Sequence, residues 1–461
     1  MILPLPDGPV PGSFRDPSGF LFVRDGVLYR QIQPVYAPHW DLFHACGLYA
    51  ALTKEGLLLP YEAVPVSDAA PGAHALIRPE PVDFISYPYE WCFSQLKDAA
   101  LLTLRIQKEA LARGMILKDA SAYNVQFHSG RPVFIDHLSF ERYVPGGPWT
   151  AFQQFCRHFL APLALMRHTD IRLSRLLQIH LDGIPLDLAS RLLPRSTWMR
   201  FSLLTYIHLH ARAQQRYAGR PVARRQSGSF SFRAMQGLVD SLESAVGRLL
   251  WTQRDTAWSD YYRTHAYSEE AFTHKQAVVS DYLDRLRPDG VWDLGANEGV
   301  FSRLAAAKGI PVKAFDLDPA VIESLYRRCR ADSETRLTPL VMDLSSPSPA
   351  LGWENKERMS LGQRGPAHTL LALALVHHLA IGNNVPLPRM AGFFRSLGAN
   401  LIVEFVPKED GQVQRLLSSR EDIFPEYIRE GFEEAFGQAY EILHRVELRD
   451  SGRLLYLMQG R

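Results

Sequence analysis

Glycines and acidic side chains at the ends of short apolar segments are the residues best suited to binding a ligand. Residues 291–299 read VWDLGANEG, in which Asp293 closes an expected strand and Gly295 and Gly299 fall in the turn before an expected helix. Glycines lack the Cβ atom that would keep a ligand away from the backbone. Asp316 follows 23 residues after Asp293, at the end of the next expected strand. A doubly wound sheet presents an acid to a ribose diol at about this place.

The same turn argues against a dinucleotide as the ligand. A GxGxxG pattern aligned on Gly295 requires glycine where the chain has Asn297 and Val300, so the pyrophosphate-binding turn is absent. A third expected strand, LTPLVMD, ends in Met342 and Asp343. These features predict a nucleoside ligand without phosphates, held by acidic side chains.

Candidate catalytic residues end the fourth and fifth expected strands. The fourth, TLLALALVHHL, brings His377 and His378 to the carboxyl edge of the sheet, and the fifth ends near Glu404. Histidine exchanges protons near neutral pH, so His378, or else His377, is a candidate base, and Glu404 is a further pocket candidate. Lining the pocket without catalysis is the alternative role for these side chains.

A second group of polar residues lies in the N-terminal half. Asp119 and Asn124 are five residues apart in KDASAYN, and Asp136 ends the apolar segment PVFID. An Asp/Asn turn in an unrelated α+β domain would explain them without any ligand.

Periodicity around these residues divides the chain into two halves. Short strands fill about the first 85 residues, with a hairpin turn at Asp25-Gly26, and residues 90–113 have helical spacing that ends at Gly114. From about residue 275 strands and helices alternate, as in a parallel α/β sheet. The expected organisation is an α+β domain (1–210), a linker (211–234) and an α/β domain (235–461).

The expected linker is strongly basic, with six arginines and no acid between Ala211 and Ala234. Its glycines, serines and proline favour a solvated segment. An anionic partner, such as phosphate, a lipid surface or RNA, is the alternative.

Composition limits the class of protein. The 461 residues are 46% hydrophobic and 22% charged, which is typical of globular domains. With 51 basic against 49 acidic side chains, no overall attraction to nucleic acid is expected. The four cysteines form no CxxC pair, so we expect neither structural zinc nor disulfides, and a cytoplasmic location. No signal peptide or transmembrane segment is expected, because the longest apolar run is too short to span a bilayer.

The C-terminal motifs together resemble those of class I S-adenosylmethionine-dependent methyltransferases. The resemblance rests on D-x-G-x-N-x-G over Asp293–Gly299, followed by Asp316 and Asp343, and covers roughly residues 275–405. It implies a Rossmann-like, seven-stranded α/β domain in which the Gly295–Gly299 turn holds the methionine part of the cofactor, with Asp293 and Asn297 among the cofactor-binding residues. Asp316 would bind the ribose hydroxyls and Asp343 the adenine amino group, with Met342 or Leu344 against the ring. Tyr267 would belong to a lid over the cofactor, and an aromatic packing segment is the alternative.

The N-terminal group resembles the catalytic segment of protein-kinase-like and aminoglycoside-phosphotransferase-like folds. That resemblance implies that Asp119 orients an acceptor hydroxyl, while Asn124 and Asp136 bind Mg²⁺ beside ATP. The chain departs from the pattern, because it has no convincing glycine-rich loop and has Arg30 as the nearest stand-in for the strand lysine. An active phosphotransferase and a degenerate binding domain both remain open.

Nearly the whole chain is similar to a bacterial family of nodulation-associated methyltransferases. The expected function is methyl transfer from S-adenosylmethionine to oxygen or nitrogen of a small molecule or glycan, with the kinase-like domain recognising the acceptor. The alternatives are a bifunctional kinase–methyltransferase that phosphorylates and then methylates a glycan end, and a non-catalytic nucleotide-binding scaffold. A nucleic-acid acceptor is not expected, because the fourth strand lacks the Asp/Asn-Pro-Pro-Tyr pattern.

Overall fold

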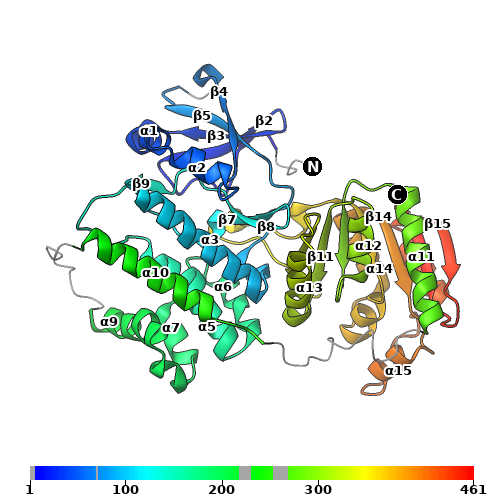
Figure 1. Cartoon of the computed structure of the whole chain (residues 1–461). Helices are drawn as coiled ribbons and strands as arrows, with labels where there is room; N and C mark the ends of the chain where they lie inside the picture. The colour runs from blue at the N-terminus through cyan, green and yellow to red at the C-terminus, as the bar shows by residue number, and fades with distance from the viewer. Residues whose placement is uncertain (1–5, 69–70, 218–229, 253–267) are drawn as a thin grey trace. The chain divides into compact units, whose positions relative to one another are not determined.

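The chain divides after Thr252 into two units, each described here by itself. The computed structural model describes residues 6–68, 71–217, 230–252 and 268–461. Unit 1 comprises Met1–Thr252 with Gly352–Glu357, and unit 2 comprises Gln253–Leu351 with Arg358–Arg461 (Figure 1). None of the helices in the described ranges is long and apolar enough to cross a membrane.

Unit 1 begins with an antiparallel sheet of five strands in the order β1-β2-β3-β5-β4. The predicted hairpin is present, with Asp25 and Gly26 at φ of 52° and 70° between β2 and β3. Positive φ at both turn positions suits the right-handed twist of the joined strands. The elements are β1 (Gly8–Pro9), β2 (Gly19–Arg24), β3 (Val27–Ile32), α1 (Ala37–Ala45), α2 (Leu48–Lys54), β4 (Tyr61–Val64) and β5 (Ala75–Pro79).

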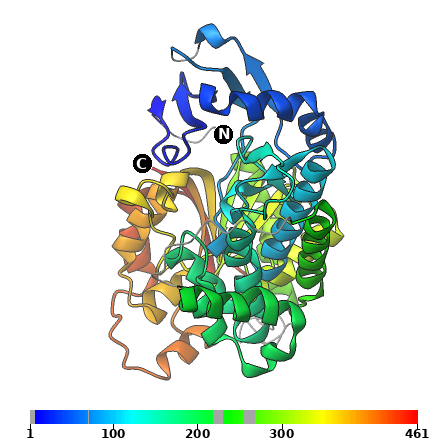
Figure 2. The same cartoon turned by 90° about the vertical axis from the view of Figure 1, so that its left-hand side faces the viewer.

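The remainder of unit 1 is mainly helical (Figure 2). Helix α3 (Phe93–Ala112) confirms the helix predicted over 90–113, and Gly114 follows it at φ of 74°. Two short antiparallel pairs come next, β6 with β9 and β7 with β8. The elements are β6 (Met115–Leu117), β7 (Val125–His128), β8 (Arg131–Phe134), β9 (Phe140–Arg142), α4 (Phe152–Phe155), α5 (Ala161–His168), α6 (Leu176–Ile179), α7 (Leu186–Leu192), α8 (Phe201–Leu203) and α9 (His210–Tyr217).

Helix α10 (Phe232–Arg248) also belongs to unit 1, whereas the sequence predicted a domain boundary at residue 235. Lys108 of α3 lies 2.7 Å from Asp240 and 2.5 Å from Glu243 of α10. The apolar face of α10 is buried against the unit. An amphipathic helix with such a face adds to whichever core covers it, so the division falls after the helix.

Unit 2 is built on a seven-stranded sheet in the order β12-β11-β10-β13-β14-β16-β15. Strands β10 to β14 are parallel, and β16 runs antiparallel to both β14 and β15. The carboxyl ends of the parallel strands β10 to β14 therefore share one edge of the sheet, where α/β sheets bind ligands. The strands are β10 (Val291–Leu294), β11 (Val312–Asp316), β12 (Leu337–Val341), β13 (Ala367–Ala372), β14 (Gly398–Phe405), β15 (Tyr440–Glu447) and β16 (Leu454–Gly460).

Helices cover both faces of this sheet. Tyr282 of α11 and Phe301 of α12 share one buried cluster with Leu457 of β16. Tyr456, the neighbour of Leu457, points to the opposite face, where its ring lies 5.1 Å from that of Phe432 in α16. The helices are α11 (Glu269–Leu286), α12 (Val300–Ala307), α13 (Pro319–Ala331), α14 (Leu387–Leu397), α15 (Gly411–Leu417) and α16 (Arg429–Gly437).

Candidate active site

The turn after β10 brings backbone to the carboxyl edge of the sheet. The amides of Gly295 and Ala296 both donate to the Phe315 carbonyl of β11 at 2.9 Å. Gly295 has φ of +77°, and a Cβ there would meet Leu375 at 3.3 Å. Gly299 has φ of +71° at the start of α12, where a Cβ would lie 2.6 Å from the Leu325 side chain. Gly295 lines the cavity described below, whereas Gly299 serves the close approach of α12 and α13.

Asp316, at the end of β11, is held by the backbone on both of its carboxylate oxygens. The amide of Asn297 donates to Oδ2 and the amide of Asp318 donates to Oδ1, each at 2.9 Å. Burial raises the pKa of Asp316 to about 6, and these two hydrogen bonds oppose that rise. The carboxylate is thus fixed in orientation beside the turn that carries Gly295.

Asp293, another predicted cofactor contact, lies behind the turn and bonds to α12. It is 2% exposed and does not line the cavity. Ser302 of α12 donates to Asp293 Oδ2 at 2.5 Å, while burial raises the pKa of Asp293 to about 6. Asp293 therefore ties the first turn of α12 to β10, and its effect on any ligand acts through the backbone of the turn between them.

The segment after β12 forms the opposite wall. Met342 is 3% exposed and Asp343 follows it, and both line the cavity. The amide and hydroxyl of Ser345 donate to Asp343 Oδ1 at 2.9 and 2.6 Å. An apolar thioether beside an oriented carboxylate suits an aromatic ring that carries an amino group.

These elements enclose a cavity of about 240 Å³ at the carboxyl edge of unit 2. Its predicted members are Gly295, Asn297, Asp316, Met342, Asp343 and His378. Its other lining residues are Lys275, Leu317, Leu344, Ser345, Leu373, Ala374, Leu375, Leu379, Gly382 and Asn383. Tyr267, the predicted lid residue, lies outside the described residues.

The two histidines sit at the start of a helical segment and not at the end of a strand. Strand β13 ends at Ala372, and a loop with Ala374 at φ of 51° leads to His378–Gly382, which form a π-helical turn. His378 lines the cavity, and burial together with Arg453 lowers its pKa to about 4. His377 is fully buried, and burial lowers its pKa well below the usual value. The geometry thus brings His378, and not His377, to the cavity.

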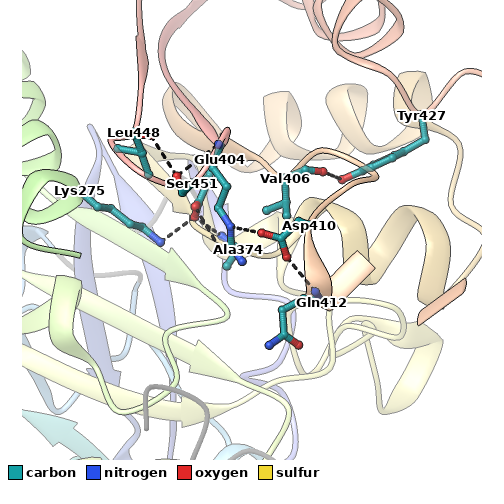
Figure 3. Close-up of polar contacts among 10 residues, drawn as sticks. Lys275, Ala374, Glu404, Val406, Asp410, Gln412, Tyr427, Leu448 and Ser451 are labelled. Carbon is teal, nitrogen blue, oxygen red and sulfur yellow. Dashed lines mark hydrogen bonds and ion pairs between the residues drawn. The ribbon is translucent and has the colours of Figure 1, made fainter. Parts of the chain in front are cut away.

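Glu404 is a structural anchor behind the cavity (Figure 3). Lys275 Nζ lies 2.6 Å from Glu404 Oε2, and the amide of Ala374 donates to the same oxygen at 2.8 Å. Arg453 Nη1 lies 3.5 Å from Glu404 Oε1, and Arg453 Nε lies 2.7 Å from Asp410. Two cations and two carboxylates therefore balance in a nearly dry region. Glu404 touches the loop that lines the cavity and does not line it itself.

In unit 1 the structure brings together the predicted residues Asp119, Asn124 and Asp136. Their side chains form hydrogen bonds or ion pairs with neighbouring protein groups. Asn124 Nδ2 donates to Ser139 Oγ at 3.1 Å, and that hydroxyl donates to Asp136. Arg30 Nη2 lies 2.5 Å from Asp136 Oδ1, with the two side chains 12% and 15% exposed. Although burial opposes ionisation of Asp136, Arg30 and Ser139 hold its pKa below the usual value.

Asp119 lies in the same region after β6. Its Oδ1 accepts the Ser121 amide at 2.9 Å, and burial and then the neighbouring Asp136 raise its pKa. Across the described ranges, no three His, Cys, Asp or Glu side chains are grouped so that they could hold a metal ion. The region therefore contains the three predicted residues, with Asp136 paired to Arg30.

Comparison with known proteins places the chain in a family. It is 35% identical to the nodulation protein NoeA of Rhizobium meliloti (strain 1021) over 468 residues, which cover 98% of this chain and 96% of that protein. The chain belongs to the NoeA family. This relative confirms the resemblance to a nodulation-associated family that the sequence indicated. No family model matches the chain.

Solved structures show more distant likenesses to the chain. The bifunctional kinase–methyltransferase WbdD is 17% identical with a TM-score of 0.31, over 45% of this chain and 43% of that one. The magnesium protoporphyrin IX methyltransferase ChlM from Synechocystis PCC 6803, with bound SAM, is 15% identical with a TM-score of 0.30, over 45% of this chain and 87% of that one. The chain thus spans less than half of the WbdD chain, and likeness at this level carries no further conclusion.

Sequence reasoning about this NoeA relative missed the cavity's contribution from α11. Lys275 lines the cavity and is 1% exposed, yet it lies among ordinary helix residues in FTHKQAVV. The available signal was its position on the apolar side of the helix, which predicts that Lys275 is buried. A buried lysine in turn requires a carboxylate partner. Gly382 ends a π-helical turn and Asn383 follows it, and both were missed because no local pattern predicts such a turn.

Proposed function

We propose that this protein is an S-adenosylmethionine-dependent methyltransferase that methylates an uncharged acceptor on a small molecule or glycan. The observation that carries the proposal is the cavity of unit 2. Gly295, Asp316, Met342 and Asp343 arrive there from three successive parallel strands. Every one of them was predicted, from the resemblance to class I methyltransferases, as a contact for the same cofactor.

The residues present fit that cofactor. Gly295 leaves open the space that a Cβ would occupy near Leu375. Asp316 is fixed by two backbone amides on one side, so its other lone pairs can accept the two hydroxyls of a ribose. Met342 and Asp343 offer a ring-sized apolar contact and an acceptor for an amino group. The cofactor would supply a methyl group on a sulfonium, which leaves as the neutral thioether.

Charge at the cavity favours an uncharged acceptor. Among the described lining residues the one lysine or arginine is Lys275, and its ammonium is paired with Glu404 at 2.6 Å. A phosphate acceptor would call for cations directed at it. His378 is neutral at physiological pH because its pKa is about 4. A neutral ring can accept the hydrogen bond of a hydroxyl, align its oxygen and receive its proton as the oxygen–carbon bond forms.

Unit 1 is proposed to be a kinase-like domain that recognises the acceptor without transferring phosphate. Asp119 follows β6, Asn124 directly precedes β7 and Asp136 follows β8, in the predicted order. Arg30, on β3, neutralises Asp136, the residue that would otherwise bind magnesium. This ion pair disfavours the bifunctional kinase–methyltransferase and gives ATP and Mg²⁺ no role in the proposal.

Titration calorimetry with S-adenosylhomocysteine tests the cofactor site. Asp316→Ala removes the ribose contact and should weaken binding roughly tenfold to a hundredfold, the usual cost of losing hydrogen bonds to a charged group. Asp284→Ala, on the exposed surface of α11, is the matched control and should bind like the wild type. Equal affinity of Asp316→Ala and the wild type would refute the site.

Transfer of a labelled methyl group to fractionated small molecules and glycans tests the reaction. The labelled fraction should resist phosphatase, because the acceptor carries no phosphate. Methylation should fall strongly in His378→Ala, while S-adenosylhomocysteine binding is retained. Cofactor binding with no transfer to any fraction would favour the non-catalytic scaffold.

A further inference from the structure

The positive charge of the chain is concentrated in the sequence between residues 143 and 233. Residues 143–233 contain 13 arginines, no lysine and three acidic residues, whereas the whole chain has a formal charge of only +2. The region therefore carries a large positive excess. The sequence analysis noted only the last part of this region, the basic segment from Ala211. The described helices before that segment carry further arginines on folded structure.

Exposed apolar side chains lie among these arginines. Met199 is 90% exposed and Phe201 is 76% exposed, on either side of Arg200. They are accompanied by exposed Leu192 of α7 and exposed Arg195. We call the following six residues the arginine–apolar patch: Arg167, Leu192, Arg195, Met199, Arg200 and Phe201.

Contacts join the parts of the patch into one surface. Thr169, just after α5, donates its hydroxyl to the Leu192 carbonyl at the end of α7 at 3.2 Å. His168 lies near both Arg167 and Arg200, and burial followed by these two cations lowers its pKa to about 4. The end of α5, the end of α7 and the turn at Arg195–Met199 therefore meet.

The turn that presents Met199 is held firmly from behind. Thr197 is fully buried, and its hydroxyl lies 2.9 Å from His208 Nε2. Trp198 stacks on His208 with ring centroids 4.3 Å apart, and the guanidinium of Arg212 lies 4.3 Å from the centroid of the Trp198 ring. Because Thr197 and Trp198 are fixed inward, the exposure of Met199 is a property of the folded turn.

The arginines of the patch are available to a partner. Arg172 and Arg191 nearby are paired with Asp170 and Asp187, each at 2.7 Å. By contrast, no carboxylate in the described part of the chain forms an ion pair with Arg167, Arg195 or Arg200. A ligand for this surface must therefore bring negative charge and accept apolar side chains at the same contact.

We propose that the arginine–apolar patch docks unit 1 on the surface of an anionic lipid bilayer. Arginine side chains would bind headgroup phosphates, and the protruding Met199, Phe201 and Leu192 would enter the boundary between headgroups and acyl chains. Nucleic acid supplies the negative charge but has no apolar layer for a methionine and a leucine.

Vesicle co-sedimentation of the full chain tests the proposal. The wild type should bind vesicles of equal parts phosphatidylcholine and phosphatidylglycerol, should bind phosphatidylcholine alone much less, and should dissociate as salt rises. Met199→Ser with Phe201→Ser removes the apolar part, and Arg195→Gln with Arg200→Gln removes charge. Each pair should lower partitioning roughly tenfold or more.

Matched controls on unit 2 separate this surface from general stickiness. Ile423→Ser and Arg389→Gln remove an exposed apolar and an exposed basic side chain there, and both should bind vesicles like the wild type. Unchanged thermal melts and S-adenosylhomocysteine affinity would show that the patch variants are folded. Failure of the wild type to bind anionic vesicles, or equal binding by both paired variants, would overturn the proposal. Binding of a single-stranded RNA in place of vesicles, lost with the arginine pair, would also overturn it.

Discussion

The ammonium of Lys275 lies 2.6 Å from Glu404 Oε2, and the two side chains are 2% and 0% exposed. Lys275 comes from α11 and Glu404 from β14, 129 residues further along the chain. The same carboxylate oxygen accepts the Ala374 amide of the loop that lines the cavity. A buried ion pair thus connects the helix before the sheet to the wall of the candidate active site.

Removing the lysine should be costly for the stability of unit 2. Lys275→Met leaves Glu404 buried with only the longer Arg453 contact, and we expect a loss of about 3–5 kcal/mol in the free energy of unfolding. Lys308→Met, which breaks an exposed pair with Asp284, should cost about 1 kcal/mol or less. Urea unfolding of both variants provides the measurement. Similar midpoints for the two would show that the buried pair contributes little.

A methyl group at Gly299 should destabilise the start of α12. The new Cβ would lie 2.6 Å from Leu325 at a φ of +71°, so both packing and backbone conformation oppose it. We expect Gly299→Ala to cost about 2–4 kcal/mol. Gly392→Ala in the exposed interior of α14 meets nothing within 4 Å and should instead stabilise by about 0.5–1 kcal/mol. Thermal unfolding should therefore move in opposite directions for the two alanines.

Cofactor affinity should depend on pH through Asp316. Its pKa is raised to about 6, so the carboxylate is ionised at pH 7 and mostly protonated at pH 5. The ionised form accepts the ribose hydroxyls, and protonation removes acceptor capacity, so affinity should fall as pH falls. We expect roughly a tenfold loss for S-adenosylhomocysteine between pH 7 and pH 5. Calorimetry on Asp316→Asn should show weaker binding whose affinity changes little between pH 7 and pH 5. If the affinity of this variant depended on pH as steeply as that of the wild type, the titration would belong to another group, such as Asp293.

The order of elements around the cavity was predictable because each one has a local signature. The apolar segments that lead to Asp316 and Asp343, and the glycines of the turn between β10 and α12, are visible in the sequence itself. The helix over residues 90–113 and the hairpin at Asp25-Gly26 follow from periodicity and turn chemistry in the same way. These features depend on neighbours within a few residues.

Features that depend on distant neighbours were not predictable. The pairing of Lys275 with Glu404 joins segments 129 residues apart, and its burial follows from the sheet between them. Asp293 and Gly299 belong to the recognised motif, yet they act on α12 and not on the cavity, because their partners Ser302 and Leu325 come from helices. The placement of α10 with unit 1 likewise depends on Lys108, far from it in the sequence.

The pairing of Arg30 with Asp136 predicts the behaviour of unit 1. If Asp136 is the partner of Arg30 and not a magnesium ligand, Arg30→Met and Asp136→Asn should each destabilise unit 1, and the double variant should cost little more than one of them. We expect a coupling of roughly 1–3 kcal/mol from a double-mutant cycle. The exposed Arg78–Glu62 pair, in the same sheet, is the control and should couple by less than about 1 kcal/mol.

Nucleotide binding completes this test of unit 1. Because the Arg30 guanidinium already neutralises Asp136, ATP with Mg²⁺ should raise the thermal midpoint of the wild type no more than ATP with EDTA does. A magnesium-dependent rise that disappears in Asp136→Asn would contradict the assignment. It would mean that the ion pair opens for a metal ion, and the phosphotransferase alternative would then account for Asp119 and Asn124 as well.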